Sequence, residues 1–264
     1  MQIEFLGTGT STGVPMIGCS CEVCRSADPR DNRLRSSVCL TVGGKNILID
    51  CGPDFRQQML RSGINHIDAV LLTHEHYDHI SGLDELRNFT RQMPIPVYAE
   101  PRVLQVVHDR FAYCFTDRPQ PGIAHLSLHE ISNLASFSLF GTEVVPLRVW
   151  HYRLPIVGYR VGAFAYITDM LSIDETECRK LADLDTLVVN ALRHKPHLSH
   201  QNLESALAFI SRIAPQRAYL THMSHQMGLH AVEEPKLPTH VAFAYDGMVI
   251  SVADGEDRPV RVMK

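Results

Sequence analysis

The chain has 264 residues, of which 45% are hydrophobic and 20% are charged, and its net charge is −4 at neutral pH. These values fit a globular protein with a substantial core, and an extended nucleic acid is not the expected partner because polyanion-binding surfaces are basic. No apolar run approaches the roughly 20 residues of a membrane span, and no signal-peptide pattern opens the chain. We expect a cytoplasmic protein that does not enter a membrane, and a homodimer stays open.

The first elements alternate strands with loops. Residues 2–6 predict a strand, and the glycine-rich stretch 7–13 follows it. This stretch lacks the Lys-Ser/Thr of a P-loop and the spacing of a dinucleotide fingerprint. We interpret it as a structural or substrate-adjacent loop. Residues 38–42 and 46–50 predict a hairpin around Gly43-Gly44, and residues 53–61 predict a helix that ends before Gly63.

Three cysteines, Cys19, Cys21 and Cys24, lie close together after the glycine-rich loop. The chain has seven cysteines, an odd number, and in a cytoplasmic protein such a cluster favours metal over disulfides. A closed tetrahedral zinc site needs four ligands, so the fourth must come from another segment. Three reduced, half-buried cysteines without metal are the alternative interpretation.

Residues 73–79 read Thr-His-Glu-His-Tyr-Asp-His and follow an apolar stretch that predicts a strand over 67–73. In an extended segment His74 and His76 point to the same side, so both can reach one ion. Asp78 and His79 lie where the loop turns into a helix, which suits a second, adjacent ion. Imidazoles with a carboxylate suit zinc, manganese or iron. A loop after a strand is a usual place for chemistry in α/β proteins.

The remaining pattern favours α/β layering. Residues 111–130 show no clean periodicity, and we interpret them as an insertion or a lid-like connection. The other segments predict helices over 82–91, 101–110, 174–181 and 201–213, strands at 96–98 and 186–192, two strands within 137–147, a hairpin over 158–161 and 163–168, a last buried strand at 218–221, a final strand opening at 245–248, and a polar tail over 255–264.

The motif His-x-His-x-Asp-His after an apolar strand resembles that of the metallo-β-lactamase superfamily. The resemblance implies an α/β fold, a four-layer αββα sandwich, over the single domain 1–264. It also implies three further ligands, His151, Asp169 and His222. Taken alone, His151 or Asp169 would be an ordinary loop residue. The implied set for one ion is His74, His76, His151 and Asp169, and for the other Asp78, His79, Asp169 and His222. A carboxylate can bridge two cations because each oxygen binds one ion.

A narrower resemblance rests on the three cysteines, on residues 221–226 and on Tyr245-Asp246-Gly247-Met248. Together these are similar to the PhnP-type cyclic phosphodiesterases of the carbon–phosphorus lyase pathway. The resemblance implies that His225 completes a structural zinc site with Cys19, Cys21 and Cys24. It also implies that His200 is the general acid. His197 competes for that role, since either imidazole titrates near the working pH.

The expected activity is hydrolysis of small cyclic or diester phosphates with two divalent ions, manganese or zinc. The ions would share a hydroxide that attacks phosphorus, with Asp78 and His200 as catalytic residues. The same ligands also suit a thioesterase or lactonase, or a tRNA 3′-end nuclease, because one centre supports several chemistries. A non-hydrolytic coenzyme-biosynthesis protein like PqqB, which shares the cysteine-rich start, is the alternative from another class.

Overall fold

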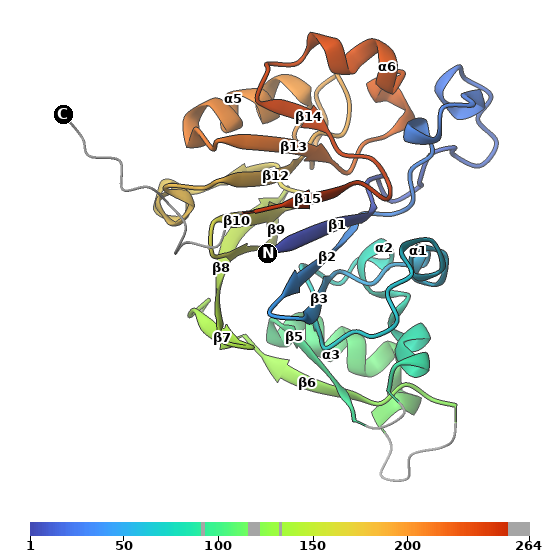
Figure 1. The fold of residues 1–264 in the computed structure, drawn as a ribbon, viewed down its shortest axis with the longest axis vertical. Helices are drawn as coiled ribbons and strands as arrows, with labels where there is room; N and C mark the ends of the chain where they lie inside the picture. The colour runs from blue at the N-terminus through green and yellow to red at the C-terminus, as the bar shows by residue number, and fades with distance from the viewer. Residues whose placement is uncertain (91–92, 116–121, 132–133, 253–264) are drawn as a thin grey trace.

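The computed structural model describes residues 1–90, 93–115, 122–131 and 134–252 (Figure 1). Within these residues the strands form two mixed sheets. The first has the order β15-β1-β2-β3-β4-β5-β6, formed by Val249–Ser251, Gln2–Gly7, Ser37–Val42, Lys45–Ile49, Ala69–Leu71, Ile95–Ala99 and Leu126–Glu130. The second has the order β11-β8-β9-β10-β12-β13-β14, formed by Ser172–Ile173, Thr142–His151, Leu154–Val161, Phe164–Ile167, Thr186–Asn190, Arg217–Thr221 and Val241–Phe243, with β7 (Phe137–Leu139) paired to β8.

Helices cover the outer faces of the two sheets (Figure 1). Beside the first sheet lie α1 (Phe55–Ser62), α2 (Tyr77–Ile80) and α3 (Pro101–Arg110), and beside the second lie α5 (Leu203–Ile213) and α6 (His230–Glu233). The short helix α4 spans Glu175–Cys178. Single 3-10 turns complete the described part: η1 (Val23–Arg25), η2 (Pro29–Asp31), η3 (Leu83–Asn88), η4 (Ala112–Phe115), η5 (Arg179–Leu181), η6 (His225–Met227) and η7 (Glu234–Lys236).

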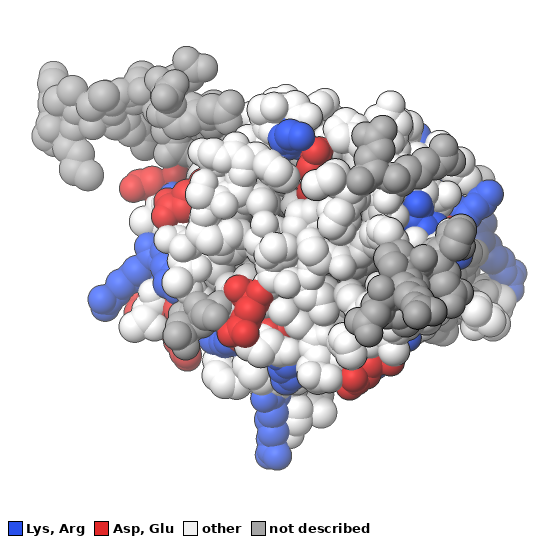
Figure 2. Space-filling model, turned by 90° about the horizontal axis from the view of Figure 1, so that it is seen from below, with Lys and Arg blue, Asp and Glu red and all other residues white. Residues whose placement is uncertain are grey.

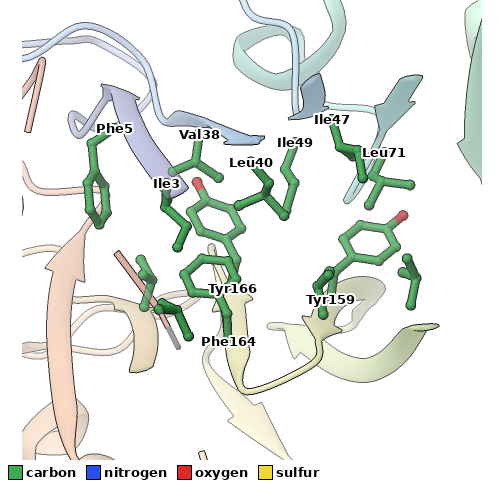
Figure 3. Packing of buried hydrophobic residues seen from close by; sticks show 14 of the residues in the cluster. Ile3, Phe5, Val38, Leu40, Ile47, Ile49, Leu71, Tyr159, Phe164 and Tyr166 are labelled. Atoms are coloured by element: carbon green, nitrogen blue, oxygen red, sulfur yellow. The ribbon is translucent and has the colours of Figure 1, made fainter. Parts of the chain in front are cut away.

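The central core lies between the two sheets. Large rings of the second sheet, Tyr159, Phe164 and Tyr166, pack against aliphatic side chains of the first sheet such as Leu40 and Ile49 (Figure 3). The Tyr159 hydroxyl also donates a hydrogen bond of 2.6 Å across the interface to the carbonyl of Leu72. Burying this apolar surface is the main force that joins the sheets, and one shared core makes the chain a single domain.

Two further cores lie between each sheet and its helices. Against the first sheet pack α1 and α3, and against the second packs α5. Helix α5 begins with a capping box in which Asn202 and Ser205 exchange hydrogen bonds. The predicted mixed α/β layering is therefore confirmed, with helices outside and two sheets inside.

Most predicted elements are present, with three differences. The stretch expected as an insertion contains β6, which extends the first sheet parallel to β5, although residues 116–121 lie outside the described part. The helix expected over 82–91 is the 3-10 segment Leu83–Asn88. The strand at 218–221 is not the last buried one, because β14 pairs with β13 and buries Val241 and Phe243. The predicted polar tail lies outside the described residues.

Charged side chains are dispersed on the surface that Figure 2 shows. Lysines and arginines alternate with acidic residues there and do not gather into one basic band. Among the described residues, no helix has the length and apolar character that crossing a membrane requires.

Candidate active site

The predicted ligands gather where strands of both sheets end. Parallel strands β3 and β4 place Asp50 and the segment Thr73–His79 at one edge. Parallel strands β10, β12 and β13 place Asp169 and His222 at the facing edge, and β8 ends at His151. The carboxyl ends of parallel strands meet at one edge of a sheet, which is where ligand sites form in α/β folds.

Three imidazoles form one half of the cluster. The Nε2 atom of His74 lies 3.0 Å from Nδ1 of His76. The ring centroid of His151 lies 5.9 Å from that of His74 and 5.2 Å from that of His76. The structure thus brings together the three histidines predicted for one ion, contributed by two different sheets.

Asp78, His79 and His222 form the other half, with Asp169 between the halves. Nε2 of His79 lies 3.2 Å from Asp78 Oδ2 and 3.3 Å from Asp169 Oδ2. The second oxygen of Asp169, Oδ1, lies 3.1 Å from Nε2 of His222. Both oxygens of this carboxylate thus face imidazoles of this half. A donor atom of Asp169 also lies within 4.8 Å of donor atoms of His74 and of His151, so Asp169 is near both halves, and a carboxylate can bind one ion with each oxygen.

The cluster fits divalent metal ions. Nε2 of His79 and both ring nitrogens of His222 are buried without a hydrogen-bond partner. Buried polar atoms are rarely left unpaired, and cations among these nitrogens and carboxylates would satisfy them. Two overlapping groups have donor atoms within 4.8 Å of one another: His74 with His79 and Asp169, and Asp78 with His79 and His222.

The electrostatics agree with a cation-binding centre. Burial disfavours the ionised form of Asp78, but the charge of His79 and the nearby imidazole of His222 outweigh it and hold the pKa of Asp78 below its usual value. Asp169 behaves likewise, and the charges of His222 and His79 hold its pKa well below the usual value despite burial. Both carboxylates are therefore ionised at neutral pH and available to cations.

Asp50 is a site residue that sequence reasoning missed. Its carboxylate Oδ2 lies 2.7 Å from Nδ1 of His79, and it accepts hydrogen bonds from the backbone and hydroxyl of Thr73. A carboxylate behind a metal-binding imidazole fixes its orientation and tautomer. An aspartate at the end of the strand that precedes the motif strand was the available signal.

Other imidazoles of the cluster are also held from behind. The Thr73 hydroxyl lies 2.9 Å from Nδ1 of His74. Nδ1 of His151 lies 2.9 Å from the carbonyl of Asp169 and 3.0 Å from that of Ser199. These contacts leave Nε2 of each ring pointing to the cluster, as ligation requires.

Several of these residues have strained backbones. Asp50, Tyr152, Asp169 and His222 have φ values of 62°, 58°, 57° and 55°. Residues other than glycine seldom adopt this left-handed conformation, and such strain concentrates at functional sites. It allows the chain to reverse directly at strand ends and present these side chains.

His200 lies inside the cluster and His197 lies beside it. The side chain of His200 is 10% exposed, and its Nδ1 lies 3.7 Å from Asp169 Oδ1. Its ring centroid lies 4.5 Å from that of His151 and 4.9 Å from that of His222. His151, Asp169 and His200 make a further group able to hold an ion. The ring of His197 is tilted by 37° against that of His200, with centroids 5.2 Å apart, and Nδ1 of His197 accepts a hydrogen bond from the backbone N–H of Ser199.

A separate cluster joins Cys19, Cys21, Cys24 and His225, whose donor atoms lie within 4.8 Å of one another. The sulfur atoms of Cys19 and Cys21 are each 3.3 Å from Nδ1 of His225. Hydrogen bonds, first from the backbone of Cys24 and then from His225, lower the pKa of Cys21 to about 6. The structure thus assembles the four predicted zinc ligands from residues about 200 positions apart in the chain.

Comparison with known proteins places the fold. A family model described as the Beta-lactamase superfamily domain matches residues 45–223. The chain belongs to this superfamily. It has the metallo-β-lactamase fold that the sequence resemblance implied. The chain is similar to a protein whose crystal structure is described as a new diphosphatase from the PhnP family. The two share 40% sequence identity and a TM-score of 0.88, over 94% of this chain and 96% of the other.

Two other relatives differ in name. A protein of Porphyromonas gingivalis named octanoyltransferase is 47% identical over 252 residues, which cover 94% of this chain and 51% of that protein. This chain therefore spans about half the length of that relative. Zinc-bound PqqB from Methylobacterium extorquens is 21% identical with a TM-score of 0.78, over 96% of this chain and all of the other. At that identity the likeness shows the fold alone.

Proposed function

We propose that this protein is a hydrolase that cleaves small phosphoric esters, namely cyclic phosphates and diesters, or the phosphoric anhydride bond of small diphosphates. The observation that carries the proposal is the position of His200, a buried imidazole beside the metal-binding cluster, where a leaving oxygen would need a proton. The 40% identity to a PhnP-family diphosphatase over nearly the whole chain supports it. The substrate is expected to be small, as the sequence predicted.

In this proposal His74, His76 and His151 would hold one ion, and Asp78, His79 and His222 would hold the other. Asp169 would serve as a ligand to both. Manganese or zinc ions there would supply positive charge that stabilises a phosphoryl group and would make water a better nucleophile at neutral pH. Asp78 is ionised at neutral pH and so has the charge that a metal ligand needs.

His200 donates a proton to the leaving oxygen. In the free protein burial is the main cause that lowers the pKa of His200 to about 3, and Asp169 only partly opposes it. An anionic phosphate in the site favours the protonated imidazole, because opposite charges stabilise each other at short range. His197 lies behind His200, so we assign the acid role to His200.

The cysteine cluster has a separate role in the proposal. Cys19, Cys21, Cys24 and His225 form a closed set of four donors, which is typical of structural zinc and leaves no position for substrate. A zinc ion there would join the segment after β1 to the segment after β13. We propose that this ion contributes to stability and takes no part in hydrolysis.

The octanoyltransferase relative favours a second candidate, hydrolysis of an ester or thioester of a medium-chain acid. The matched region covers 51% of that protein, so the activity in its name belongs to a chain about twice as long as the matched part. Dinuclear centres of this kind can act on carbonyl as well as phosphoryl groups. We rank it second because the phosphatase relative matches over its full length.

A substrate comparison tests the proposal. The metal-loaded protein is assayed with bis(p-nitrophenyl) phosphate, a 2′,3′-cyclic ribonucleotide, a nucleoside diphosphate and an octanoyl thioester. We expect turnover of one or more phosphorus substrates and none of the thioester. Hydrolysis of the thioester alone would replace the proposal with the second candidate.

His200→Asn tests the acid role against the ligand role. A nitrophenolate leaves without a proton, whereas the ribose alkoxide of a cyclic nucleotide needs one. We expect His200→Asn to lose about 10²–10⁴-fold in kcat with the cyclic nucleotide, and far less with the nitrophenyl diester. Its metal content should stay unchanged. Loss of an ion together with equal losses on both substrates would make His200 a ligand.

A further inference from the structure

Two motifs that the proposed mechanism does not use lie next to each other. The glycine-rich loop 7–13 and the stretch Tyr245–Met248 are more than 230 residues apart in the chain. The backbone of Phe5 bonds to Gly247 at 2.7 Å and to Met248 at 2.9 Å. The hydroxyl of Thr8 donates to Asp246 at 2.8 Å.

Thr8 and Asp246 belong to a buried charged network. Arg33 donates to the Thr8 hydroxyl at 2.9 Å and to the carbonyl of Ala244 at 2.6 Å. Asp246 also accepts from the backbone of Leu34 at 2.8 Å. Thr8 is fully buried and Arg33 is 6% exposed. The hydroxyl of Thr8 therefore receives one hydrogen bond, donates another and is fixed in direction by both.

The backbone of Thr8 connects this network to the active site. Met223 donates its N–H to the carbonyl of Thr8 at 3.0 Å, and Thr10 donates to the carbonyl of Met223 at 3.0 Å. Gly9 lies between them, and a Cβ atom there would come within 2.7 Å of the carbonyl oxygen of Arg33. The loop thus forms a short strand-like pair with the residue that directly follows His222.

His222 depends on its backbone more than the other imidazoles do. His74, His79 and His151 each have a partner at Nδ1, as described above. Nδ1 of His222 is buried and has no hydrogen-bond partner among the described residues. Its ring is stacked between those of His79, at 5.9 Å, and His200, at 4.9 Å, and its Nε2 faces Asp169 within the cluster, so within the described part of the chain no side chain holds the ring from behind.

We propose that the buried Arg33–Thr8–Asp246 network is a positioning device for His222. It replaces the side-chain partner that the other imidazoles have, and it acts through the backbone pairing of Thr8 and Thr10 with Met223. These three residues are positioning residues, since none of them contacts the metal-binding cluster. The inference rests on the proposed function only in assuming an active-site ion.

Thr8→Val removes the hydroxyl and keeps the shape. The probe is Mn²⁺, whose binding to protein with zinc on the cysteine cluster is followed by electron paramagnetic resonance. Loss of an outer partner of a metal ligand typically costs 10–100-fold in affinity. We expect that loss for the weaker of the two Mn²⁺ sites in Thr8→Val. Thr8→Ser, which restores a hydroxyl, should bind as the unsubstituted protein does.

Thr186→Val is the matched control. Thr186 is equally buried, and its hydroxyl donates to Asp185 at 2.7 Å. Thr186 begins β12, whereas the cluster lies beyond the other end of this strand, at Asn190. Both variants lose one buried hydroxyl–carboxylate contact, but only Thr8→Val should weaken Mn²⁺ binding. Equal Mn²⁺ affinities in the two variants would reduce the network to a purely structural role.

If Thr8→Val does not fold, Asp246→Asn takes its place with hydrogen exchange as a second measurement. The inference requires faster exchange at the Met223 amide together with weaker Mn²⁺ binding. An unchanged Met223 amide with unchanged affinity would overturn it. Neither measurement uses a substrate, so failure of the proposed phosphoesterase activity would leave this result interpretable.

Discussion

Replacing Asp50 by asparagine tests how the imidazole of His79 is held. Asp50 is fully buried. Its Oδ1 accepts from the Thr73 backbone at 2.8 Å, and its Oδ2 lies 2.7 Å from Nδ1 of His79 and 2.8 Å from the Thr73 hydroxyl. Asparagine tolerates the left-handed backbone at this position, where φ is 62°. The substitution therefore changes charge and hydrogen bonding with little change in shape.

The magnitude follows from these contacts. Asparagine keeps one oxygen for the Thr73 backbone and presents an NH₂ group where Oδ2 was, so the N–H of His79 loses its acceptor. One buried unsatisfied donor costs about 1–3 kcal/mol of stability. Removing an outer carboxylate of this kind lowers metal affinity by about 10–100-fold, which corresponds to about 1.4–2.8 kcal/mol of binding free energy.

Denaturant unfolding and metal titration against a chelator measure both effects. Asp68→Asn is the control, because it also removes one carboxylate charge. Asp68 pairs with Lys45 at 2.9 Å on the surface, away from the cluster. We expect the control to lose little stability and no metal affinity. If Asp50→Asn bound metal as tightly as the control and unfolded at the same denaturant concentration, Asp50 would not orient His79.

Two other predictions follow from backbone packing and thiol chemistry. A Cβ atom at Gly52 would lie 2.1 Å from the carbonyl oxygen of Asp78, so Gly52→Ala should cost about 1–3 kcal/mol or more in thermal unfolding and weaken metal binding. Gly43→Ala is the control, because Gly43 lies in open space in the turn between β2 and β3, at a φ of 56°. It should leave metal binding unchanged, and equal binding in both variants would contradict the packing argument. In metal-stripped protein at pH 7, Cys21 with a pKa of about 6 is mostly thiolate, whereas burial is the main cause that raises the pKa of Cys24 to about 11. Iodoacetamide should therefore modify Cys21 first, which mass spectrometry can follow. Faster modification of Cys24 would refute the assignment.

The structure brings the predicted ligands together, whereas several element boundaries differ from the prediction. Ligand types at fixed spacing after strands carry strong local information, so the motif at 73–79 and the cysteine triplet were recognised directly. Asp169 and His222 carry little information alone, and their assignment depended on the family resemblance. The structure brings them within 3.1 Å of each other, which only the pairing of parallel strands explains.

What the sequence did not predict depends on long-range contacts. Asp50 looked like an ordinary strand end, because its role exists only once β3 and β4 pair in register. The strand β6 alternates apolar and polar residues over only four positions, Leu126 to His129, and its pairing with β5 at the sheet edge defines it. The buried strand β14 is only three residues long, and its pairing with β13 defines it. Tertiary context overrides local propensity at such positions.

The most direct test of the central claim is metal-restored hydrolysis of bis(p-nitrophenyl) phosphate. Metal-stripped protein is titrated with Mn²⁺ and then with Zn²⁺, and Asp78→Ala is titrated in parallel, with circular dichroism to verify folding. We expect the turnover rate to rise as active-site metal is added, and we expect no turnover with Asp78→Ala at any metal concentration. Turnover that is unchanged by stripping, or retained in Asp78→Ala, would contradict a phosphoesterase that works through this cluster.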